Sequence, residues 1–565
     1  MSSNDATRIL LEERRPEHAG EQGSLSSQTL HGSSQDMETA SWKGEALGMD
    51  DASSLDYVKV PLNKIQFALV YMSLAFSIFL GSLDQTIITT ALPAIAKELK
   101  SFDEISWIGT AFLVSCAAFT PFYGKLTDIF GRKFAILTAV TIFEIGSLIC
   151  GAAPTMNVLI AGRAIAGVGF GGMYSLVVII VSDIDSLRDR GKFQGIIGAV
   201  MGLAAVVGPV LGGGFTDGIS WRWCFYINLP LGGIALVIIA MMLRYPPEPR
   251  SEEPVLSKLR RIDYLGMALI FGAVVCLQVP LDFGGDKWAW SDWQTITMLS
   301  CSAVLFILFG LAQVFAASEP MLPPVLFSTT SLICVFIYAF LYGVSFFGLI
   351  YYLPTYFQIV NGDTAVQSGV AVMPFVAGLV VSNLVSGALV SRFGHYKPIV
   401  MVGSAILYIG TGLISTYSQY TSRVAQAMFQ VIAGIGVGCI MQMRIIAIQS
   451  LVASEHMAVG TSIVSFFSTL GGSIGVGIVG AIFKNVLNSQ LGPQLSEIVS
   501  NSPTSVHQLP QAMLDQALDG FSRAFQTGYK ALIPTAGLII VCLIFVKPAP
   551  TGRGDKRESV AVFAD

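Results

Sequence analysis

The sequence predicts an all-α integral membrane protein with two six-helix halves and two extra helices between them in the chain. Of its 565 residues, 53% are hydrophobic and only 12% are charged, whereas a water-soluble chain has about 25% charged residues. This much apolar surface cannot be buried inside a globule that faces water. Apolar stretches of about 20 residues span a bilayer as helices, and such stretches recur from Phe67 to Val546. A repeated sequence pattern, described below, divides them into two halves.

At about 20 apolar residues per helix, the sequence predicts about fourteen membrane spans. In chain order the predicted spans are 67–92, 105–124, 134–153, 157–180, 192–216, 224–244, 263–284, 294–316, 332–353, 367–390, 398–416, 424–449, 459–483 and 530–547. The first six lie in a predicted N-terminal half over 63–245. The next two are linker helices over 263–316, and the last six lie in a C-terminal half over 332–548.

Four segments outside the spans are expected to face water. Residues 1–62 are rich in Ser, Glu, Asp and Gly and lack apolar periodicity, so we expect a disordered cytoplasmic tail. Because this stretch is polar, no cleavable signal peptide is expected, and the first span should direct insertion. Residues 246–262 are expected to form a cytoplasmic loop and 549–565 a cytoplasmic tail. Residues 484–529 are expected to form a long outside loop that contains a short amphipathic helix.

The basic residues predict the orientation. The loops after the second, fourth, sixth and tenth spans are rich in them: Lys125, Arg132, Lys133, Arg188, Arg190, Lys192, Arg244, Arg250, Lys258, Arg260, Arg261, Arg392 and Lys397. The opposite loops carry fewer: Lys97, Lys100, Arg222 and Lys287. Loops rich in Lys and Arg face the cytoplasm, so both termini are expected there. The expected location is the plasma membrane, with the vacuolar membrane as the alternative.

Two loop sequences form a weak internal repeat. "GKLTDIFGRK" (124–133) follows the second span, and "GALVSRFGHYK" (387–397) follows the tenth. Each has two glycines seven residues apart, a Leu two residues after the first and a Phe before the second. The displacement of eight helices fits six plus six helices with two inserted between them. Repeated halves are a mark of secondary transporters.

Composition and motif searches exclude several other classes. The formal net charge of −4 argues against nucleic acid as a partner, and the eight cysteines all fall inside apolar runs, where they serve as small apolar residues. The five histidines are scattered and form no metal-spaced group, and no GxxxxGK[ST] phosphate loop occurs. We therefore expect neither an enzyme nor an ATP-driven pump, and no cofactor or metal.

Asp84 is the only acid in the first span. An ionised carboxylate is expensive in lipid, so Asp84 either faces a polar cavity or is protonated much of the time. A carboxyl that alternates between these forms is a proton-coupling group. The alternative is a fixed ion pair, with Arg163 as the partner. Glu144 in the third span is a second intramembrane acid and a further proton-coupling candidate.

Arg163 lies in "LIAGRAIAGVGFGG" (159–172), in the outer half of the fourth span. An arginine within the hydrocarbon costs about 2.5–3.5 kcal/mol even on the lowest scale. Arg163 is therefore expected to face a polar cavity or an acidic partner. The alternative is that its long side chain reaches the outer interface.

The loop "GKLTDIFGRK" is a predicted gating loop. Gly124 permits a close helix approach, and Gly131 permits a turn with positive φ. Asp128 can pair with Arg132 or sit at a helix N-terminus, where the helix dipole favours an anion. A charged contact of this kind can hold one conformation and release it in another. The alternative is a basic loop with a solvated acid.

The fifth span contains "GIIGAVMGLAAVVGPVLGG" (195–213), in which small residues recur at four-residue spacing. Ala204, Gly208 and Gly212 share one face, so a neighbouring helix can pack backbone to backbone there. Pro209 removes a helix hydrogen bond and permits a kink. The sequence thus predicts that this helix packs tightly on a neighbour and can still tilt against it.

Polar and aromatic side chains in the later spans are candidates for a substrate cavity. The substrate-cavity candidates are Gln358, Tyr356, Asn383 and Gln442. Other polar residues in these spans are Gln278, Gln313, Gln430, Arg444 and Gln449. Taken singly, each of these is expected more often to make an interhelical hydrogen bond than to contact a ligand.

These strings together resemble a known family. "LDQTIITTALP", "GKLTDIFGRK", "RAIAGVGFGG", "GPVLGG" and "WRWCFYINLP" are similar, in order and location, to the signature motifs of the major facilitator superfamily. "RIDYLG" and "YYLPTYFQIVNG" also fit its fourteen-spanner drug:proton antiporter branch, especially the fungal members that export toxins and drugs. The resemblance covers about residues 65–550.

The resemblance implies proton influx that drives export of a hydrophobic small molecule through the bilayer by alternating access, in a protein we expect to be a monomer. It assigns proton relay to Asp84 and Arg163. It assigns gating to Gly124, Asp128, Gly131 and Arg132, and the antiporter hinge to Gly195, Gly208, Pro209, Gly212 and Gly213. One departure is Ala204, where the hinge motif usually has Gly, and another is Ser391, which replaces the acid in the second loop copy.

The alternative within the same fold is proton-coupled uptake or vacuolar transport, of a siderophore or an amino acid. The hinge motif, which the family associates with antiport, favours export.

Overall fold

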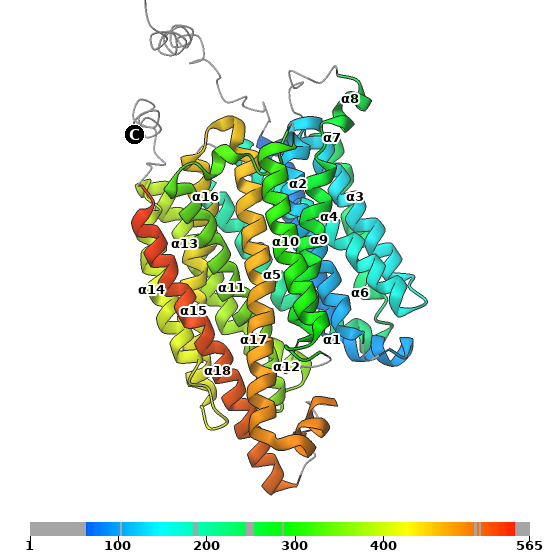
Figure 1. Ribbon diagram of the computed structural model, residues 1–565, viewed down its shortest axis with the longest axis vertical. Helices are drawn as coiled ribbons and strands as arrows, with labels where there is room; N and C mark the ends of the chain where they lie inside the picture. The colour runs from blue at the N-terminus through cyan, green and yellow to red at the C-terminus, as the bar shows by residue number, and fades with distance from the viewer. Residues whose placement is uncertain are drawn as a thin grey trace, which may run out of the picture. The chain divides into compact units, whose positions relative to one another are not determined.

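Figure 1 shows the computed structural model of the chain. It describes residues 64–101, 104–184, 190–243, 253–284, 288–317, 319–501, 506–507 and 510–547, all within the compact unit Val58–Asp565. Within these ranges fourteen helices are long and apolar enough to cross a membrane. The predicted all-α fold with fourteen spans is confirmed. The tails predicted over 1–62 and 549–565 lie outside the described residues.

The N-terminal half is built from seven helical segments. They are α1 (Lys64–Leu99), α2 (Ile105–Phe130), α3 (Arg132–Gly151), α4 (Met156–Ile184), α5 (Arg190–Gly218), α6 (Trp223–Tyr226) and α7 (Asn228–Met242). Helix α4 packs between α2 and α3, while α1 packs against α5 and α7. The short α6 and α7 together form the sixth span.

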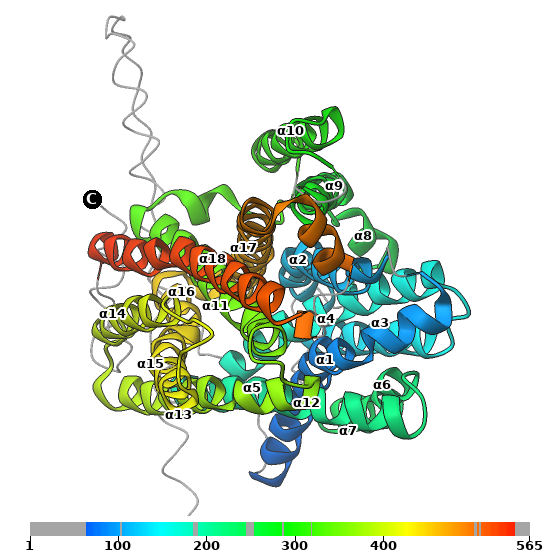
Figure 2. The same ribbon diagram turned by 90° about the horizontal axis from the view of Figure 1, so that it is seen from below.

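The linker helices are central in the chain but peripheral in space. The short helix α8 (Val255–Arg260) precedes α9 (Tyr264–Phe283) and α10 (Trp293–Phe315). Asp263 caps α9, because its carboxylate accepts a hydrogen bond from the Gly266 amide over 2.7 Å. Helix α9 contacts α2 and α17, and α10 packs on α9 at the edge of the bundle seen in Figure 2. Helix α10 is the least buried span.

The C-terminal half repeats the bundle with longer helices. After a 3-10 turn (Pro324–Phe327) come α11 (Thr330–Ile359), α12 (Ala365–Ala371), α13 (Met373–Phe393), α14 (Lys397–Ile414), α15 (Arg423–Met441), α16 (Met443–Leu451), a 3-10 turn (Ser454–His456), α17 (Met457–Asn501) and α18 (Gln511–Phe545). Helix α11 packs against α17 and α18, and α15 packs between α13 and α14.

The segment predicted over 484–529 as an outside loop with a short amphipathic helix is largely helical, so the two flanking helices are longer than predicted. Helix α17 continues to Asn501 and α18 begins at Gln511. The physical reason is an apolar seam: Leu491 and Phe525 are both buried in the core cluster of the C-terminal half. A Cβ on Gly520 would lie 2.9 Å from a Leu491 methyl carbon, so the two helices stay in contact well past the predicted boundaries.

The two ends of the helix bundle are identified by the helix connections at each end. The α2–α3 end carries Gly131 and α8, at the top of Figure 1, and the α1–α2 end lies toward the opposite side, near α12. The two halves meet where α5 packs on α12 and α13 and where α17 packs on α2 and α4.

Candidate functional site

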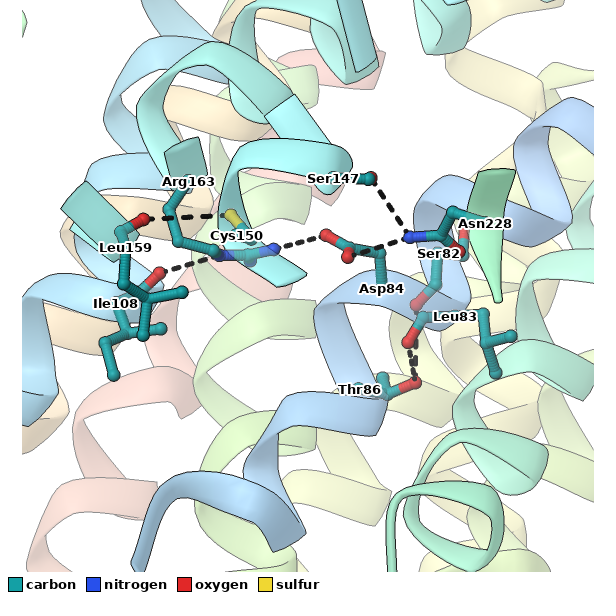
Figure 3. A network of polar contacts seen from close by, with 10 residues as sticks. All are labelled: Ser82, Leu83, Asp84, Thr86, Ile108, Ser147, Cys150, Leu159, Arg163 and Asn228. Carbon is teal, nitrogen blue, oxygen red and sulfur yellow. Dashed lines mark hydrogen bonds and ion pairs between the residues drawn. The ribbon is translucent and has the colours of Figure 1, made fainter. Parts of the chain in front are cut away.

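Asp84 lies at the centre of the N-terminal half and is fully buried. Arg163 of α4 is also buried and donates from Nη1 to Asp84 Oδ2 as an ion pair, as Figure 3 shows. Arg163 Nε donates to the carbonyl of Ile108 over 3.0 Å, and its guanidinium carbon lies 4.3 Å from the centre of the Phe112 ring. The structure therefore brings the two predicted residues together inside the helix bundle.

Asn228, at the start of α7, completes this site. Its Nδ2 lies 3.2 Å from Asp84 Oδ1 and 3.2 Å from Ser147 Oγ on α3, and it donates to both. The carboxylate is thus held from α4 and α7 at once (Figure 3). Asn228 was not among the predicted site residues, because it lies in the aromatic motif "WRWCFYINLP", which suits an interface. A single amide in an otherwise apolar stretch was the available signal.

Glu144 lies one helical turn from Ser147 on α3. Its side chain is only 9% exposed, and neither carboxylate oxygen has a hydrogen-bond partner among the described residues. It fits against α7 because Gly232 has no side chain there, and a Cβ at that position would overlap the carboxylate. Glu144 and Ser147 therefore face Gly232 and Asn228, two residues one turn apart on α7. This places Glu144 beside the Asp84 network without joining it.

The predicted hinge residues divide between two faces of α5. Gly208 and Gly212 lie against α1: a Cβ on Gly208 would be 2.9 Å from the amide nitrogen of Ile87, and one on Gly212 would overlap the carbonyl of the same residue. Thr86 Oγ1 donates to the carbonyl of Ala204 over 3.1 Å. This part of the α1–α5 contact therefore lies about half a turn from Asp84.

The remaining hinge residues face the C-terminal half. A Cβ on Gly195 would lie 3.2 Å from the carbonyl of Asn383 on α13, and one on Gly213 would lie 3.4 Å from the Val366 side chain on α12. Pro209 approaches Gly369, also on α12. One face of α5 therefore touches the helix that carries Asp84, and the other touches the opposite half.

The gating loop has the predicted turn. Gly131 adopts φ of 86°, which favours glycine, and its amide donates to the carbonyl of Thr127 over 3.0 Å. Arg132 Nε donates to Asp183 Oδ2 on α4 over 3.1 Å. Asp128 is half-buried on the last turns of α2. Asp183 was missed, because nothing in its local sequence marks it as a partner 51 residues from Arg132.

Polar contacts join the two halves at the α2–α3 end. Gly124 lies against α17, where an added Cβ would be 2.7 Å from the Cβ of Ser462. The hydroxyls of Ser175 and Ser462 lie 2.6 Å apart, and Gln449 donates to Ser182 over 2.7 Å. Gly124, predicted to permit close approach, does so toward the other half of the protein.

A charged cluster ties the linker to the gating loop. Glu319 accepts from Arg261 Nε over 2.6 Å and forms a 3.0 Å ion pair with Lys125. Burial raises the pKa of the Glu319 carboxyl, but hydrogen bonds from Arg261 and Lys125 outweigh it, so this pKa is lowered from its ordinary value. The carboxylate therefore stabilises the fold above that ordinary value, and this contribution is lost as the pH falls through the lowered pKa.

Replacing Glu319 with Gln is expected to reduce the free energy of unfolding by about 1 kcal/mol at neutral pH, because the network is partly exposed to solvent. The loss should vanish in strong acid, where wild-type Glu319 is protonated. Thermal unfolding of the purified protein across pH measures this. Asp519→Asn removes the same charge from an exposed pair with Arg523 and should change nothing. An equal loss at every pH would contradict the argument.

The four candidate cavity residues separate into two places. Asn383 and Gln442 meet at Gly198 of α5, where an added Cβ would overlap the Asn383 amide and lie 3.3 Å from Gln442 Nε2. Tyr356 is instead buried inside the C-terminal half, and its hydroxyl donates to the carbonyl of Ser418 over 3.0 Å. Gln358 donates to Ser368 over 2.9 Å. Asn383 and Gln442 therefore lie at the boundary between the halves.

Comparison with known proteins agrees with this architecture. The family model described as Major Facilitator Superfamily matches residues 74–476. The chain is 38% identical over 439 residues to "MFS-type efflux pump MFS1" of Trichophyton rubrum, covering 77% of this chain and 82% of that protein. It is 34% identical over 471 residues to "Efflux pump aflT" of Aspergillus parasiticus, covering 82% of this chain and 92% of that protein.

Solved structures share the fold. The proton:xylose symporter XylE has a TM-score of 0.56 at 14% identity, covering 88% of this chain and 99% of that one. A bacterial homologue of the human lysosomal transporter Spinster has a TM-score of 0.55 at 15% identity, covering 85% and 97%. Since the family model spans most of the chain and the relatives exceed 30% identity over most of their own length, this protein belongs to the Major Facilitator Superfamily.

Proposed function

We propose that this protein exports hydrophobic small molecules in exchange for protons, by alternating access between its two halves. The relatives named as efflux pumps support export. The observation that carries proton exchange is the buried Asp84–Arg163 pair, held by α1, α4 and α7. The free energy needed to remove both charges from water can exceed the attraction between them, so fold stability alone explains this pair poorly.

Protonation of Asp84 would weaken the contacts that hold these helices together. A neutral carboxyl no longer attracts Arg163 as an ion pair and gives Asn228 a weaker acceptor. Because Gly208 and Gly212 of α5 pack on α1 within about one turn of Asp84, a small movement of α1 reaches α5. Helix α5 also touches α12 and α13, so the other half would feel the change.

The orientation follows from the basic residues of the gating loop. Lys125, Arg132 and Lys133 lie at the α2–α3 end, which the charge rule assigns to the cytoplasm. The polar contacts between Ser175 and Ser462 and between Ser182 and Gln449 would then close the cytoplasmic side. We propose a plasma-membrane protein with both termini cytoplasmic that functions as a monomer and needs no cofactor besides the proton gradient.

The energetics permit export. One proton that enters across about 100 mV releases about 2.3 kcal/mol, and one pH unit adds about 1.4 kcal/mol. Together these support an outward concentration ratio of several hundredfold.

The test is efflux from yeast cells that lack their own drug pumps, loaded with a panel of fluorescent hydrophobic compounds. Cells that express this protein should retain several-fold less of at least one compound than vector controls, and a protonophore should abolish the difference. Greater retention in the expressing cells would indicate uptake instead. Efflux that persists unchanged with the protonophore would overturn proton coupling.

Glu144 is proposed as a second proton station beside Asp84. Replacing Glu144 with Gln keeps the shape that fits Gly232 but removes the ionisable group, and efflux is expected to fall about tenfold, a barrier change of about 1.4 kcal/mol. Efflux rates measured at several external pH values check this. Thr141→Ala, which removes an exposed hydroxyl from the same helix, serves as the neighbouring control. An unchanged rate and pH profile would make Glu144 a packing residue.

A further inference from the structure

Arg444 lies at a break between two helices in the C-terminal half. Helix α15 ends at Met441 and α16 begins at Met443, so the regular helix is interrupted at Gln442, whose backbone stays right-handed with φ of −93° and ψ of −16°. Arg444 is only 1% exposed and is one of the largest fully buried side chains. Its Nη1 donates to the carbonyl of Met441, and Nη2 donates to the hydroxyl of Tyr174 over 2.6 Å. Its Nε has no hydrogen-bond partner among the described residues.

No carboxylate of the described residues pairs with Arg444. Across the part of the chain that the structure describes, Arg444 forms no ion pair, whereas the other fully buried arginine, Arg163, is paired with Asp84. An arginine keeps its charge at any physiological pH. A buried cation that has only a carbonyl, a hydroxyl and a ring as partners will gain strongly from an anion placed beside it.

Aromatic rings line one side of Arg444. The guanidinium carbon lies 4.4 Å from the centre of the Tyr342 ring. Tyr342 stacks on Phe346 with ring centres 5.7 Å apart and an angle of 8° between the planes. Phe346, which is half-buried, meets Phe347 edge to face at 4.9 Å. A fixed positive charge therefore stands at one end of an aromatic column.

The position of Arg444 is between the two halves. Tyr174 belongs to α4 of the N-terminal half, so the hydrogen bond to Arg444 joins the halves and must break when they separate. Nη2 would then be free in addition to Nε. Close by, Oε1 of Gln442 and Oδ1 of Asn383 are buried without partners among the described residues. Interrupted helices are where transporters often build substrate sites.

We propose that Arg444 binds an anionic oxygen of the transported molecule, and that the preferred substrates are planar aromatic carboxylic acids. This rests on the proposed function in transport and names its substrate class. The carboxylate pairs with the guanidinium, and the ring stacks along Tyr342 and Phe346. The competing role for Arg444 is structural, as a cap on the Met441 carbonyl that the helix break leaves open.

The test measures equilibrium binding to the detergent-purified full-length protein, by ligand-induced thermal stabilisation. The probes are planar aromatic carboxylates, from 2-naphthoate to anthraquinone-2-carboxylate, each paired with its primary amide. Wild type is expected to bind the acid of at least one pair about tenfold or more tightly than the amide. Arg444→Gln should remove this preference and leave the Kd of the amide within about twofold. Arg444→Lys should keep part of it.

Tyr338→Phe is the matched control. The Tyr338 hydroxyl donates to the carbonyl of Ile440 over 2.8 Å and so caps the same helix break without a charge. This variant should keep the acid preference. Equal binding of acid and amide by wild type in every pair would overturn the proposal without any variant being needed. An acid preference that survives in Arg444→Gln, or an equal loss for acid and amide, would overturn it too.

Binding and transport fail separately in this design. Binding needs no gradient, so acid-selective binding without proton-driven efflux would overturn the proposed function and leave this inference standing. Proton-driven efflux of neutral compounds, together with no preference for acids in the binding assay, would support the proposed function and overturn this inference.

Discussion

Replacing Asp84 with Asn is expected to abolish proton-driven efflux, by about a hundredfold or more, with little loss of folded protein. Asn matches Asp in shape and can still accept a hydrogen bond from Arg163 or Asn228, but it cannot carry a proton. A difference of this size corresponds to about 2.7 kcal/mol in the transport barrier. Efflux rates in pump-deficient yeast, at matched surface expression and with an imposed pH gradient, measure it.

A purely structural ion pair would also make Asp84→Asn defective, so the experiment needs a second arm. Arg163→Gln removes the other partner, and the double variant removes both charges. If the pair serves only stability, the double variant should recover folding and transport, because the harm of a single variant comes from one buried charge left unpaired. If Asp84 carries the proton, the double variant should fold but remain unable to couple.

Two results would contradict the proposal for Asp84. One is protonophore-sensitive efflux by Asp84→Asn at the wild-type rate. The other is full recovery in the double variant. Either result would leave Asp84 as a structural partner of Arg163 and move the coupling role to Glu144.

Replacing Gly208 with Ala is expected to have the second largest effect. The added methyl would overlap the Thr86 hydroxyl and lie 2.8 Å from the Thr86 Cβ and 2.9 Å from the Ile87 amide nitrogen. Backbone cannot give way as a flexible side chain does, so α1 and α5 must separate. Overpacking of this kind costs about 1–3 kcal/mol, and we expect a lower unfolding temperature and efflux reduced at least about tenfold.

Helix α5 supplies its own control for this variant. Gly214 lies six residues along the same helix, and a Cβ there would meet nothing within 4 Å. Gly214→Ala should therefore be neutral or slightly stabilising, by up to about 1 kcal/mol, because alanine favours helix. Similar behaviour of the two variants in thermal unfolding and efflux would show that the α1–α5 approach does not matter.

The sequence was sufficient for the fold class and most of the spans, because length and hydropathy are local properties of each helix. At 484–529 it predicted a short amphipathic helix but not the full length of α17 and α18. Leu491 and Phe525 bury one face of those helices, and a hydropathy average over the segment cannot detect a single apolar face.

The candidate site was predictable where a charge is out of place in lipid. Asp84, Arg163 and Glu144 stand out because each is costly in a span. Asn228 and Asp183 do not stand out, since an amide at a helix start and an acid at a helix end are common. Their roles appear only when α7 reaches Asp84 and α4 reaches Arg132. Such pairings depend on the packing of distant helices, which a single sequence does not record.

Helix α17 is long enough for a small rotation at one end to displace the other end by several ångströms. Its 45 residues run without interruption, a length of about 68 Å at about 1.5 Å per residue, or roughly twice the hydrocarbon thickness of a bilayer. Ser462, near one end, touches the hydroxyl of Ser175 across the boundary between the halves. A rigid-body rotation of about 15° would move the far end by about 7–9 Å if the pivot lies near mid-helix. Under the proposed alternating access, a fluorophore near Ser489, which is exposed, would therefore report each transport cycle from the end of α17 opposite to Ser462.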